Sequence, residues 1–349
     1  MSKPFMGWDI GGAHLKAALL DDSGEVLQVL QLPCKLWLGL DQLAIAINNT
    51  LQAFKIEPAE AKHAVTMTGE LVDLFANRHE GVMEISTLVT KSLGKDTLFY
   101  AAPSVSDTGG FVALERVSAL TPCIASSNWH ASASALAMQA NDALFIDIGS
   151  TTTDIIAIEA GKVSSLNLSD AARMADDSLV YTGVVRTPVM ALAQKLPFEG
   201  AQINLAAEYF ATMADVYRLT GELLPEHDMA ETADGKGKTA LESARRLARM
   251  VGHDVESKPI ETWKSLANTC KTLQMNQIKH ALLKHLKPNM SIIGAGAGNF
   301  LVQQIASELN YAYQSISMRL TGDTSLINVH DLEVCFTAYA VATLARQDA

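Results

Sequence analysis

Residues 145–158, FIDIGSTTTDIIAI, form an apolar run, a short polar turn and a second apolar run. This pattern predicts a β-hairpin whose turn holds a phosphate group. Gly149 has no Cβ, so backbone N–H groups can approach an anion there, and the hydroxyls of Ser150, Thr151 and Thr152 add donors beside them. An ordinary hairpin turn favours the same residue types, so this stretch alone fits either interpretation.

Two aspartates, Asp147 and Asp154, flank this turn. Carboxylates so close to a phosphate would repel it unless a divalent cation lies between them. Mg²⁺ is usually held by a few carboxylates, substrate phosphates and waters. We therefore expect Mg²⁺ at this hairpin, with both aspartates as candidate ligands.

A second copy of the pattern begins at residue 7, where GWDIGGAHLKAALLDDSGEV aligns with FIDIGSTTTDIIAIEAGKV. The alignment pairs Asp9 with Asp147, Gly11 with Gly149, and Lys16 with Asp154. Asp9 is accordingly a third candidate metal ligand, Gly11 and Gly12 are candidate phosphate contacts, and Lys16 is a candidate phosphate-binding cation. Two such hairpins predict two similar α/β lobes that face one polyphosphate across a cleft.

A glycine-rich loop follows late in the chain, at MSIIGAGAGNF, residues 290–300. Its glycines are Gly294, Gly296 and Gly298. A dinucleotide-binding loop would normally open an early βαβ unit and be followed by an acidic residue about 20 positions on, whereas Glu308 is too near. In the order hairpin, hairpin, glycine loop, the chain resembles the actin, heat-shock chaperone and sugar-kinase superfamily of ATPases. That resemblance implies that these glycines approach a bound adenosine.

The fold class that follows is α/β, with two actin-like (ribonuclease H-like) lobes. We expect the first lobe to span residues 1–140 and the second residues 141–349. Within the second lobe we expect a helical insertion at about 190–287 and the glycine loop at 292–299. The chain has 349 residues, and single cores stop growing near 250–300 residues, so two lobes are expected on size alone.

Polar residues near predicted strand ends are substrate candidates in the first lobe. Glu70 follows a strand expected at residues 63–68, and open α/β sheets bind ligands at such strand ends. A helix is expected to open at residue 69, so Glu70 could instead only stabilise the N-terminus of that helix through its dipole. A second helix is expected from about residue 128 to 138, capped by Ser126 or Ser127. Asn128 and His130 lie in its first turn, where a histidine is also commonly structural.

In the second lobe, the segment at residues 169–188 mixes charges with Tyr181 and Arg186. Tyr181 is a further substrate candidate. The planar guanidinium of Arg186 suits a bidentate grip on phosphate, and a surface loop with a salt bridge is the alternative. Amphipathic helices are expected at residues 204–221, 238–252 and 260–286, and the basic run SARRLARM is expected on a solvated face with at most one arginine inward.

Bulk properties exclude several classes of protein. The net charge of −11 and the absence of a Lys/Arg cluster argue against a nucleic-acid-binding protein. No stretch reaches the uncharged length of about 18 residues that a membrane span needs. The cysteines show no metal-binding or disulfide spacing, which predicts buried thiols in a cytoplasmic protein. They are Cys34, Cys123, Cys270 and Cys335.

Six motifs together, WDIGGAHLKAA, TMTGEL, NWHASA, DIGSTTTDI, YTGVVRTPV and TADGKGKT, resemble one family along nearly the whole chain. It is the hydantoinase/oxoprolinase-related group of tetrahydromethanopterin-linked one-carbon transfer, which includes a methanofuran-biosynthesis synthase. The resemblance implies a transferase that joins an (aminomethyl)furanylmethyl diphosphate to the phenol of a γ-glutamyl-tyramine-like or tyrosine-like partner. Diphosphate is released, and the product belongs to methanofuran or methylofuran biosynthesis.

For such a transferase, the expected catalytic residues are Asp9, Lys16, Asp147 and Arg186. Alternatives are an ATP-dependent hydantoinase or oxoprolinase-type amidohydrolase, a small-molecule kinase and a non-enzymatic actin-like ATPase. The first hairpin has GAH at residues 12–14 where many sugar kinases carry Ser or Thr, which disfavours the kinase. The sequence leaves open whether ATP or a substrate diphosphate occupies the cleft, and whether the chain forms a homodimer.

Overall fold

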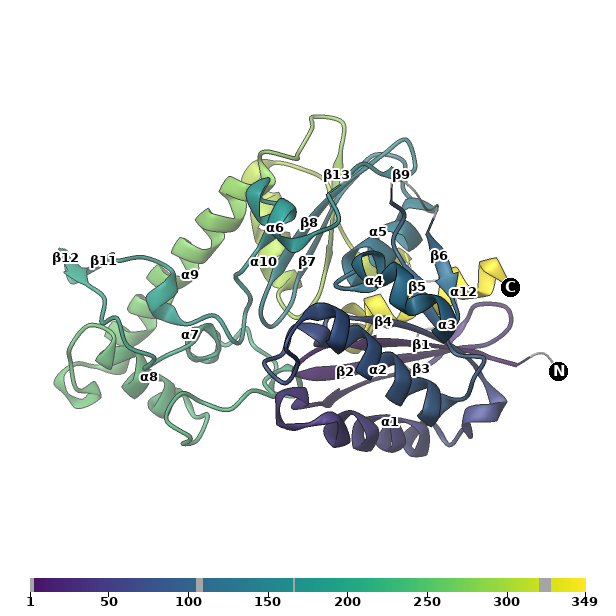
Figure 1. Cartoon of the computed structure of the whole chain (residues 1–349). Helices are drawn as coiled ribbons and strands as arrows, with labels where there is room; N and C mark the ends of the chain where they lie inside the picture. Colours follow the sequence, from purple (N-terminus) through teal and green to yellow (C-terminus); the bar gives the residue numbers. More distant parts are fainter. Residues whose placement is uncertain (1–2, 105–108, 166, 320–327) are drawn as a thin grey trace. The chain divides into compact units, whose positions relative to one another are not determined.

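The computed structural model describes residues 3–104, 109–165, 167–319 and 328–349 (Figure 1). The chain divides into two compact units. Unit 1 comprises Met1–Ala143, Ile156–Asp176 and Ser315–Ala349, and unit 2 comprises Leu144–Ile155 and Asp177–Gln314.

The sheet of unit 1 has six strands in the order β3-β2-β1-β4-β5-β6. β1 and β2 form an antiparallel hairpin in which Asp9 is opposite Lys16, whereas β4 runs parallel to β1. The strands are β1 (Phe5–Ile10), β2 (His14–Leu20), β3 (Val26–Pro33), β4 (Lys62–Met67), β5 (Leu98–Ala101) and β6 (Gly110–Val112). Every residue of β1 is buried, as expected for a central strand that is covered on both faces.

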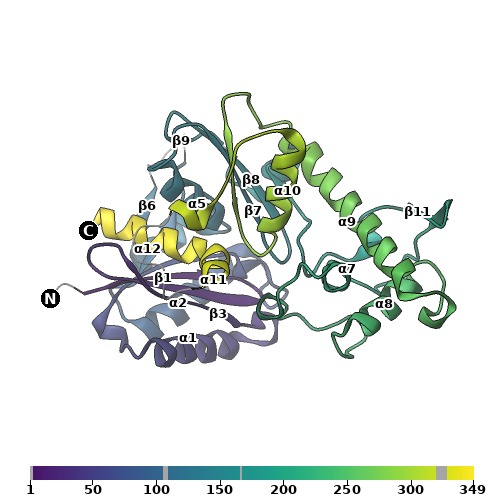
Figure 2. The ribbon, with the colours of Figure 1, turned by 180° about the vertical axis from the view of Figure 1, so that it is seen from behind.

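Helices cover both faces of this sheet, α1 and α2 on one and α12 with α5 on the other (Figures 1 and 2). The helices of unit 1 are α1 (Leu40–Phe54), α2 (Arg78–Leu93), α3 (Leu114–Val117), α4 (Thr121–Ile124), α5 (Asn128–Ala137), α6 (Asp170–Ala175), α11 (Val329–Val334) and α12 (Phe336–Asp348). Short 3-10 helices lie at Leu36–Leu38, Pro58–Glu60, Gly69–Leu71, Ser118–Leu120 and Ile316–Arg319.

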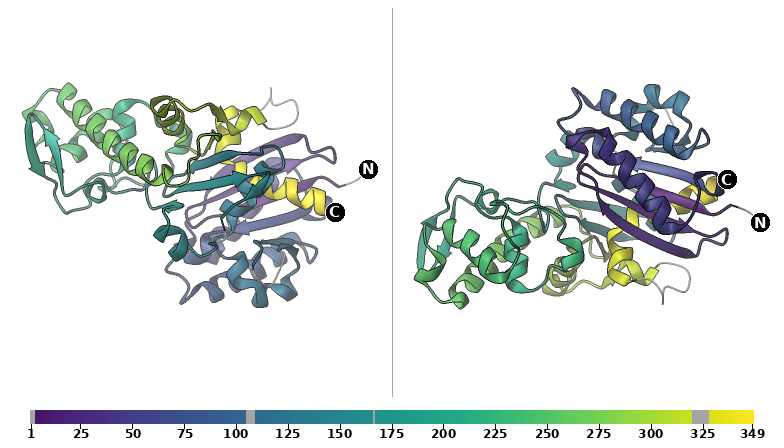
Figure 3. Two further views of the ribbon diagram at one scale, coloured as in Figure 1. Left: turned by 90° about the horizontal axis from the view of Figure 1, so that it is seen from above. Right: turned by 90° about the horizontal axis from the view of Figure 1, so that it is seen from below.

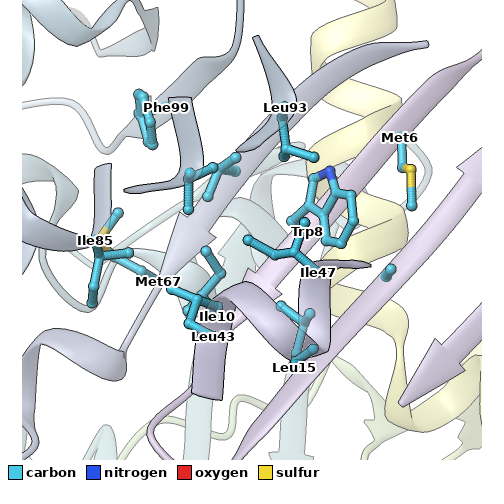
Figure 4. Packing of buried hydrophobic residues seen from close by; sticks show 14 of the residues in the cluster. Met6, Trp8, Ile10, Leu15, Leu43, Ile47, Met67, Ile85, Leu93 and Phe99 are labelled. Atoms are coloured by element: carbon cyan, nitrogen blue, oxygen red, sulfur yellow. The ribbon is translucent and has the colours of Figure 1, made fainter. Parts of the chain in front are cut away.

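The core of unit 1 centres on large apolar side chains of β1 and β2 packed against α1 and α2 (Figure 4). Trp8 is fully buried, and its indole Nε1 donates to His63 Nδ1 at 3.1 Å. On the other face, a Cβ added to Gly7 would overlap the carbonyl oxygen of Ala338. Glycine in the strand and alanines in α12 therefore allow the close packing that the alanine-rich C-terminal stretch predicts.

The second sheet repeats the arrangement of the first. Its order is β10-β8-β7-β13-β14, with β9 paired to β8. The strands are β7 (Ala143–Ile148), β8 (Thr153–Glu159), β9 (Lys162–Val163), β10 (Leu179–Val180), β13 (Ser291–Ala295) and β14 (Tyr313–Ser315). Gly24 and Gly161 each lie in the turn before the third strand of their copy, and both have positive φ, 94° and 69°. The sequence repeat is thus a structural repeat.

The remaining elements of unit 2 are mainly helical, and α7, α8 and α9 gather beside a two-stranded hairpin (Figure 3). They are β11 (Lys195–Phe198), β12 (Ala201–Asn204), α7 (Met213–Thr220), α8 (Ala240–Arg249), α9 (Ile260–Leu282) and α10 (Asn299–Leu309), with 3-10 helices at Val189–Ala191, Pro225–His227 and Val255–Ser257. In α8, Arg246 is fully buried and bonded to Asp215 at 2.8 Å, so one arginine of the basic run does point inward.

Two expected elements were wrong in extent. The chain after Gly69 makes only a 3-10 turn to Leu71, and α2 begins at Arg78, where Asn77 caps it by accepting from the Glu80 amide. The helix expected at 204–221 starts only at Met213, where Thr212 forms a capping box with Asp215. None of the helices in the described residues is both long and apolar enough to cross a membrane.

Candidate active site

The two hairpin turns are closed by the same hydrogen bond. Gly11 N–H donates to the His14 carbonyl at 2.9 Å, and Gly149 N–H donates to the Thr152 carbonyl at 2.9 Å. These residues are equivalent in the sequence alignment. The two copies therefore share their turn geometry as well as their strand pattern.

The amides that follow each glycine are placed to receive an anion. In the described residues, the N–H groups of Gly12, Ala13, Ser150 and Thr151 donate to no backbone carbonyl, and all four residues are half-buried. Adjacent unpaired amides in a tight turn form the concave arrangement that binds phosphate. This geometry supports the predicted phosphate contacts, which stay a prediction.

In unit 1, Asp9 and Lys16 form an ion pair across the hairpin, with Lys16 Nζ 3.4 Å from Asp9 Oδ2. Asp9 is only 3% exposed, and its Oδ1 is buried with no hydrogen-bond partner among the residues described. An unsatisfied buried carboxylate oxygen costs free energy, and a bound cation would remove that cost. The surroundings of Asp9 therefore fit the predicted role in holding Mg²⁺.

In unit 2, Asp147 is the last residue but one of β7 and Asp154 lies near the start of β8, and both are half-buried. Across the described ranges, no group of three or more His, Cys, Asp or Glu side chains converges into a metal site. Mg²⁺ commonly keeps several waters and takes only one or two carboxylates, so the proposal for these aspartates does not require such a group.

The glycine loop packs directly on the second hairpin. Gly298 N–H donates to the Ile148 carbonyl at 2.8 Å. Gly296 has a φ of 83°, and a Cβ there would overlap both the Ile148 carbonyl oxygen and the Asp147 carboxylate. At Gly294 a Cβ would overlap Asn299 Oδ1. Each glycine thus has a packing role within the protein, and the role toward a nucleotide stays a prediction.

Arg186 lies against the second hairpin turn. Three successive amides of its segment donate to that turn: Val184 to the Gly149 carbonyl at 3.1 Å, and Val185 and Arg186 to the Ser150 carbonyl at 3.1 and 2.8 Å. The Arg186 side chain is exposed. The structure therefore joins two motifs, DIGSTTTD and YTGVVRTPV, that are separate in the sequence.

Residues that sequence analysis overlooked hold this segment in place. Gln274 on α9 is fully buried and donates to Thr182 Oγ1 at 2.8 Å and to the Gly183 carbonyl at 2.9 Å, while accepting from the Tyr217 hydroxyl. Gln274 lies in the apolar helix stripe with Cys270 and Ile278, and this polar interruption is the signal that could have identified it.

Replacing Gly183 with alanine should lower activity and destabilise the protein. A Cβ at this position would lie 2.5 Å from both Ser150 C and Thr151 N, so the hairpin turn must shift. We expect a loss of about 1–3 kcal/mol from overpacking. The measurement is the thermal midpoint together with turnover. The control is Gly221→Ala. A Cβ added there meets no atom within 4 Å, so the only cost is backbone strain from a φ of 78°. Equal turnover in the two variants would contradict a role for this contact.

In unit 1, Glu70 lies in a buried polar cluster next to the first hairpin. It is 1% exposed, and its Oε1 accepts from Ser126 Oγ at 2.8 Å. Ser126 also lies 3.4 Å from Asp170 Oδ2, which is paired with Arg78 at 2.6 Å. Ser126 does not cap α5, because its side chain is committed to this cluster, and Ser127, at the cap position, makes no capping bond. Burial raises the pKa of Glu70 to about 7.

The other substrate candidates differ in surroundings. His130 is 7% exposed, its Nδ1 lies 2.8 Å from the Tyr100 hydroxyl, and burial with the nearby Arg173 charge lowers its pKa to about 4. It is therefore neutral at pH 7, and its contacts are those of a structural residue. Asn128 is half-buried at the start of α5, and Tyr181, in unit 2, is 51% exposed.

The raised pKa of Glu70 predicts that the stability of the folded protein depends on pH. The folded protein keeps this proton up to about pH 7, whereas the unfolded chain releases it near the ordinary glutamate pKa of 4.5. Stability should therefore fall as pH rises from about 4.5 to 7, by about 3 kcal/mol in total. Glu70→Gln should lack this component, so its thermal midpoint relative to wild type should rise between pH 5 and 8. A pH-independent difference would contradict the assignment.

Repeated hairpin-led sheets with a glycine loop define an α/β protein of the actin-like ATPase and sugar-kinase fold. Solved structures with this fold include component A of (R)-2-hydroxyglutaryl-CoA dehydratase from Acidaminococcus fermentans, with a TM-score of 0.51, 10% identity and coverage of 99% of each chain. A nucleotide-free acetone carboxylase gives a TM-score of 0.56 at 10% identity, covering 98% of this chain and 70% of that one. At such identities the likeness concerns the fold alone.

The chain belongs to the hydantoinase/oxoprolinase family, whose model matches residues 62–319. It is also similar to a curated relative from Methanocaldococcus jannaschii, with 31% identity over 252 residues, 72% of each chain. That relative is named (4-{4-[2-(γ-L-glutamylamino)ethyl]phenoxymethyl}furan-2-yl)methanamine synthase.

Proposed function

We propose that this protein is a synthase of methanofuran-type cofactor biosynthesis. It would join an (aminomethyl)furanylmethyl diphosphate to the phenol of a γ-glutamyl-tyramine or tyrosine-like partner and release diphosphate. The observation that carries the proposal is the 31% identity to the M. jannaschii synthase across 72% of both chains. The name of that relative describes the aryl ether that such a reaction would form.

The reaction requires two things of the protein. It must stabilise the charge on the departing diphosphate, and it must place the phenol oxygen. A furan ring spreads positive charge, so the methylene carbon loses diphosphate readily once the departing charge is offset. The phenol oxygen must lie behind that carbon, and proximity supplies much of the remaining rate. The carbon–oxygen bond to diphosphate breaks with its electron pair on the leaving group, and the aryl ether bond forms.

The residues that the sequence predicts at each hairpin would serve the leaving group. The turn amides beside Gly11 and Gly149 would donate to its oxygens, and Lys16 and Arg186 would offset its charge. Lys16 is a point charge, whereas Arg186 offers a planar fork for two oxygens. Asp9 and Asp147 would hold Mg²⁺, directly or through waters, and the metal would supply further positive charge to the diphosphate.

The experiment that tests the proposal is product formation. The protein is incubated with Mg²⁺, the furan diphosphate and either γ-glutamyl-tyramine or tyrosine, and the aryl ether is sought by mass spectrometry. We expect the ether with at least one of the two phenols. Its absence with both would contradict the proposal.

The family match also favours a second candidate, an ATP-dependent amidohydrolase acting on a hydantoin or lactam. For that activity, phosphate release from ATP should depend on the added cyclic amide. Amide-dependent ATP turnover without ether formation would replace the first candidate with the second.

A further inference from the structure

Glu70 stands apart from the other charged groups of its cluster. Asp170 from α6 pairs with Arg78 from α2 at 2.6 Å, whereas Oε1 of Glu70 accepts from the neutral Ser126 hydroxyl. Its second oxygen, Oε2, is buried and has no hydrogen-bond partner in the part of the chain that the structure describes. Burying an uncompensated carboxylate oxygen is costly, so a functional reason for this arrangement is expected.

Ser126 is held in an uncommon backbone conformation. Ser126 has a φ of 51°, in the left-handed region that side-chain-bearing residues rarely adopt. Ala125, just before it, makes a parallel bridge to Met67 at the end of β4, so the serine is held at the strand end beside Glu70. Strained residues of this kind tend to cluster at active sites.

Glu70 directly follows two residues that contact the first hairpin turn. Thr68 N–H donates to the Ile10 carbonyl at 2.9 Å. A Cβ on Gly69 would lie 3.3 Å from that carbonyl oxygen and 3.4 Å from the Gly11 oxygen. Within unit 1, Glu70 is therefore the next residue after backbone that contacts this turn.

The chain that follows Glu70 has little regular structure. After the 3-10 helix Gly69–Leu71 the chain is irregular and mostly exposed until Arg78. Leu71 and Leu74 in this segment are each 40% exposed, which gives apolar surface suited to an aromatic ring.

We propose that Glu70 is the general base that removes the phenolic proton, an inference that rests on the proposed function. The proton passes from the phenol oxygen to Glu70 Oε2. The oxygen's electron pair then forms the aryl ether bond to the methylene carbon, and diphosphate leaves with the electron pair of the broken bond. The proton on Glu70 is returned to solvent before the next turnover.

Neighbouring groups are less suited to this role. His130, with a pKa of about 4, is a weak base, and its Nδ1 is engaged by Tyr100. Asp170 is already paired with Arg78. A base whose pKa lies near 7 combines a useful ionised fraction with the strength to accept a proton, and burial gives Glu70 such a pKa.

The test compares pH profiles of kcat in wild type, Glu70→Gln and Glu70→Asp between pH 5.5 and 9.5. Wild-type kcat should rise through about pH 7 and then level off. Glu70→Gln should lose about 10²-fold near pH 7.5, since general base catalysis contributes at least that much. Its remaining rate should keep rising with pH toward the phenol's own pKa near 10, and Glu70→Asp should restore part of the activity.

A more acidic, fluorinated phenol distinguishes a base from a structural residue, because it should narrow the gap between Glu70→Gln and wild type. Glu333→Gln, at another buried glutamate of unit 1, is the matched control and should keep the wild-type profile. If kcat of Glu70→Gln still rose near pH 7, the base assignment would be wrong but the proposed function would stand. A change confined to KM for the furan diphosphate would have the same meaning. A wild-type protein that forms no ether would overturn the proposed function and this inference with it.

Discussion

Arg186→Ala should lower kcat for ether formation by about 10²–10³-fold while the protein remains folded. Negative charge grows on diphosphate as its bond to carbon breaks, so a cation beside it is worth more in the transition state than in the ground state. Removal of one such donor typically costs this much in kcat. The backbone of Arg186 is fixed to the Ser150 carbonyl at 2.8 Å, and alanine keeps that bond. The effect should therefore come from the side chain.

Three further variants refine this test. Arg186→Lys keeps the charge but loses the planar fork, so it should be impaired less than alanine. Lys16→Ala should also lower kcat, although it frees Asp9 of its partner at 3.4 Å and so must be checked for folding. The control is Arg245→Ala on α8, an arginine paired with Glu256. Unchanged kcat in folded Arg186→Ala would place Arg186 outside the catalytic machinery.

Asp147→Asn should lower turnover by about 10³-fold and weaken Mg²⁺ binding. A metal that stabilises transition-state charge contributes several kcal/mol, and each 1.36 kcal/mol is tenfold in rate. The asparagine keeps the size of the side chain, so the hairpin and Gly296, which packs against it, should be retained. Mg²⁺ affinity is measured directly by titration calorimetry, and kcat is measured as a function of Mg²⁺ concentration.

The matched control lies just before the same strand. Asp142 precedes β7 at its other end and accepts from the Ala160 amide at 3.3 Å, a bond that Asp142→Asn can keep. Asp9→Asn should behave like Asp147→Asn, because it alters the equivalent position of the first hairpin. If Asp147→Asn left both Mg²⁺ affinity and turnover intact, the metal role of the second hairpin would be wrong.

The sequence predicted the repeated hairpins well, because their information is local. Each combines apolar strands, a glycine turn and a fixed spacing, and the equivalence of Gly11 with Gly149 extends to their turn hydrogen bonds. The fold class followed from the order of these motifs, and the actin-like neighbours bear it out. The family followed from six motifs together, and the family match confirms it.

Local sequence patterns did not predict the tertiary contacts. Nothing in YTGVVRTPV shows that its amides bond the turn of a hairpin that precedes it, or that Gln274, almost a hundred residues later, fixes it. Likewise, helix propensity suggested a helix after Gly69, whereas the burial of Glu70 against Ser126 favours a short turn. Burial also determines the pKa of Glu70, and composition alone does not reveal burial. The lobe boundaries and the site roles stay predictions.

The most direct measurement of the central claim is the identity of the released anion. With Mg²⁺, the furan diphosphate and the phenol, diphosphate and phosphate are quantified together with the ether, and parallel reactions contain ATP in place of the furan diphosphate. The account predicts one diphosphate for each ether formed, with no requirement for ATP. Phosphate release that depends on ATP, without ether or diphosphate, would contradict it.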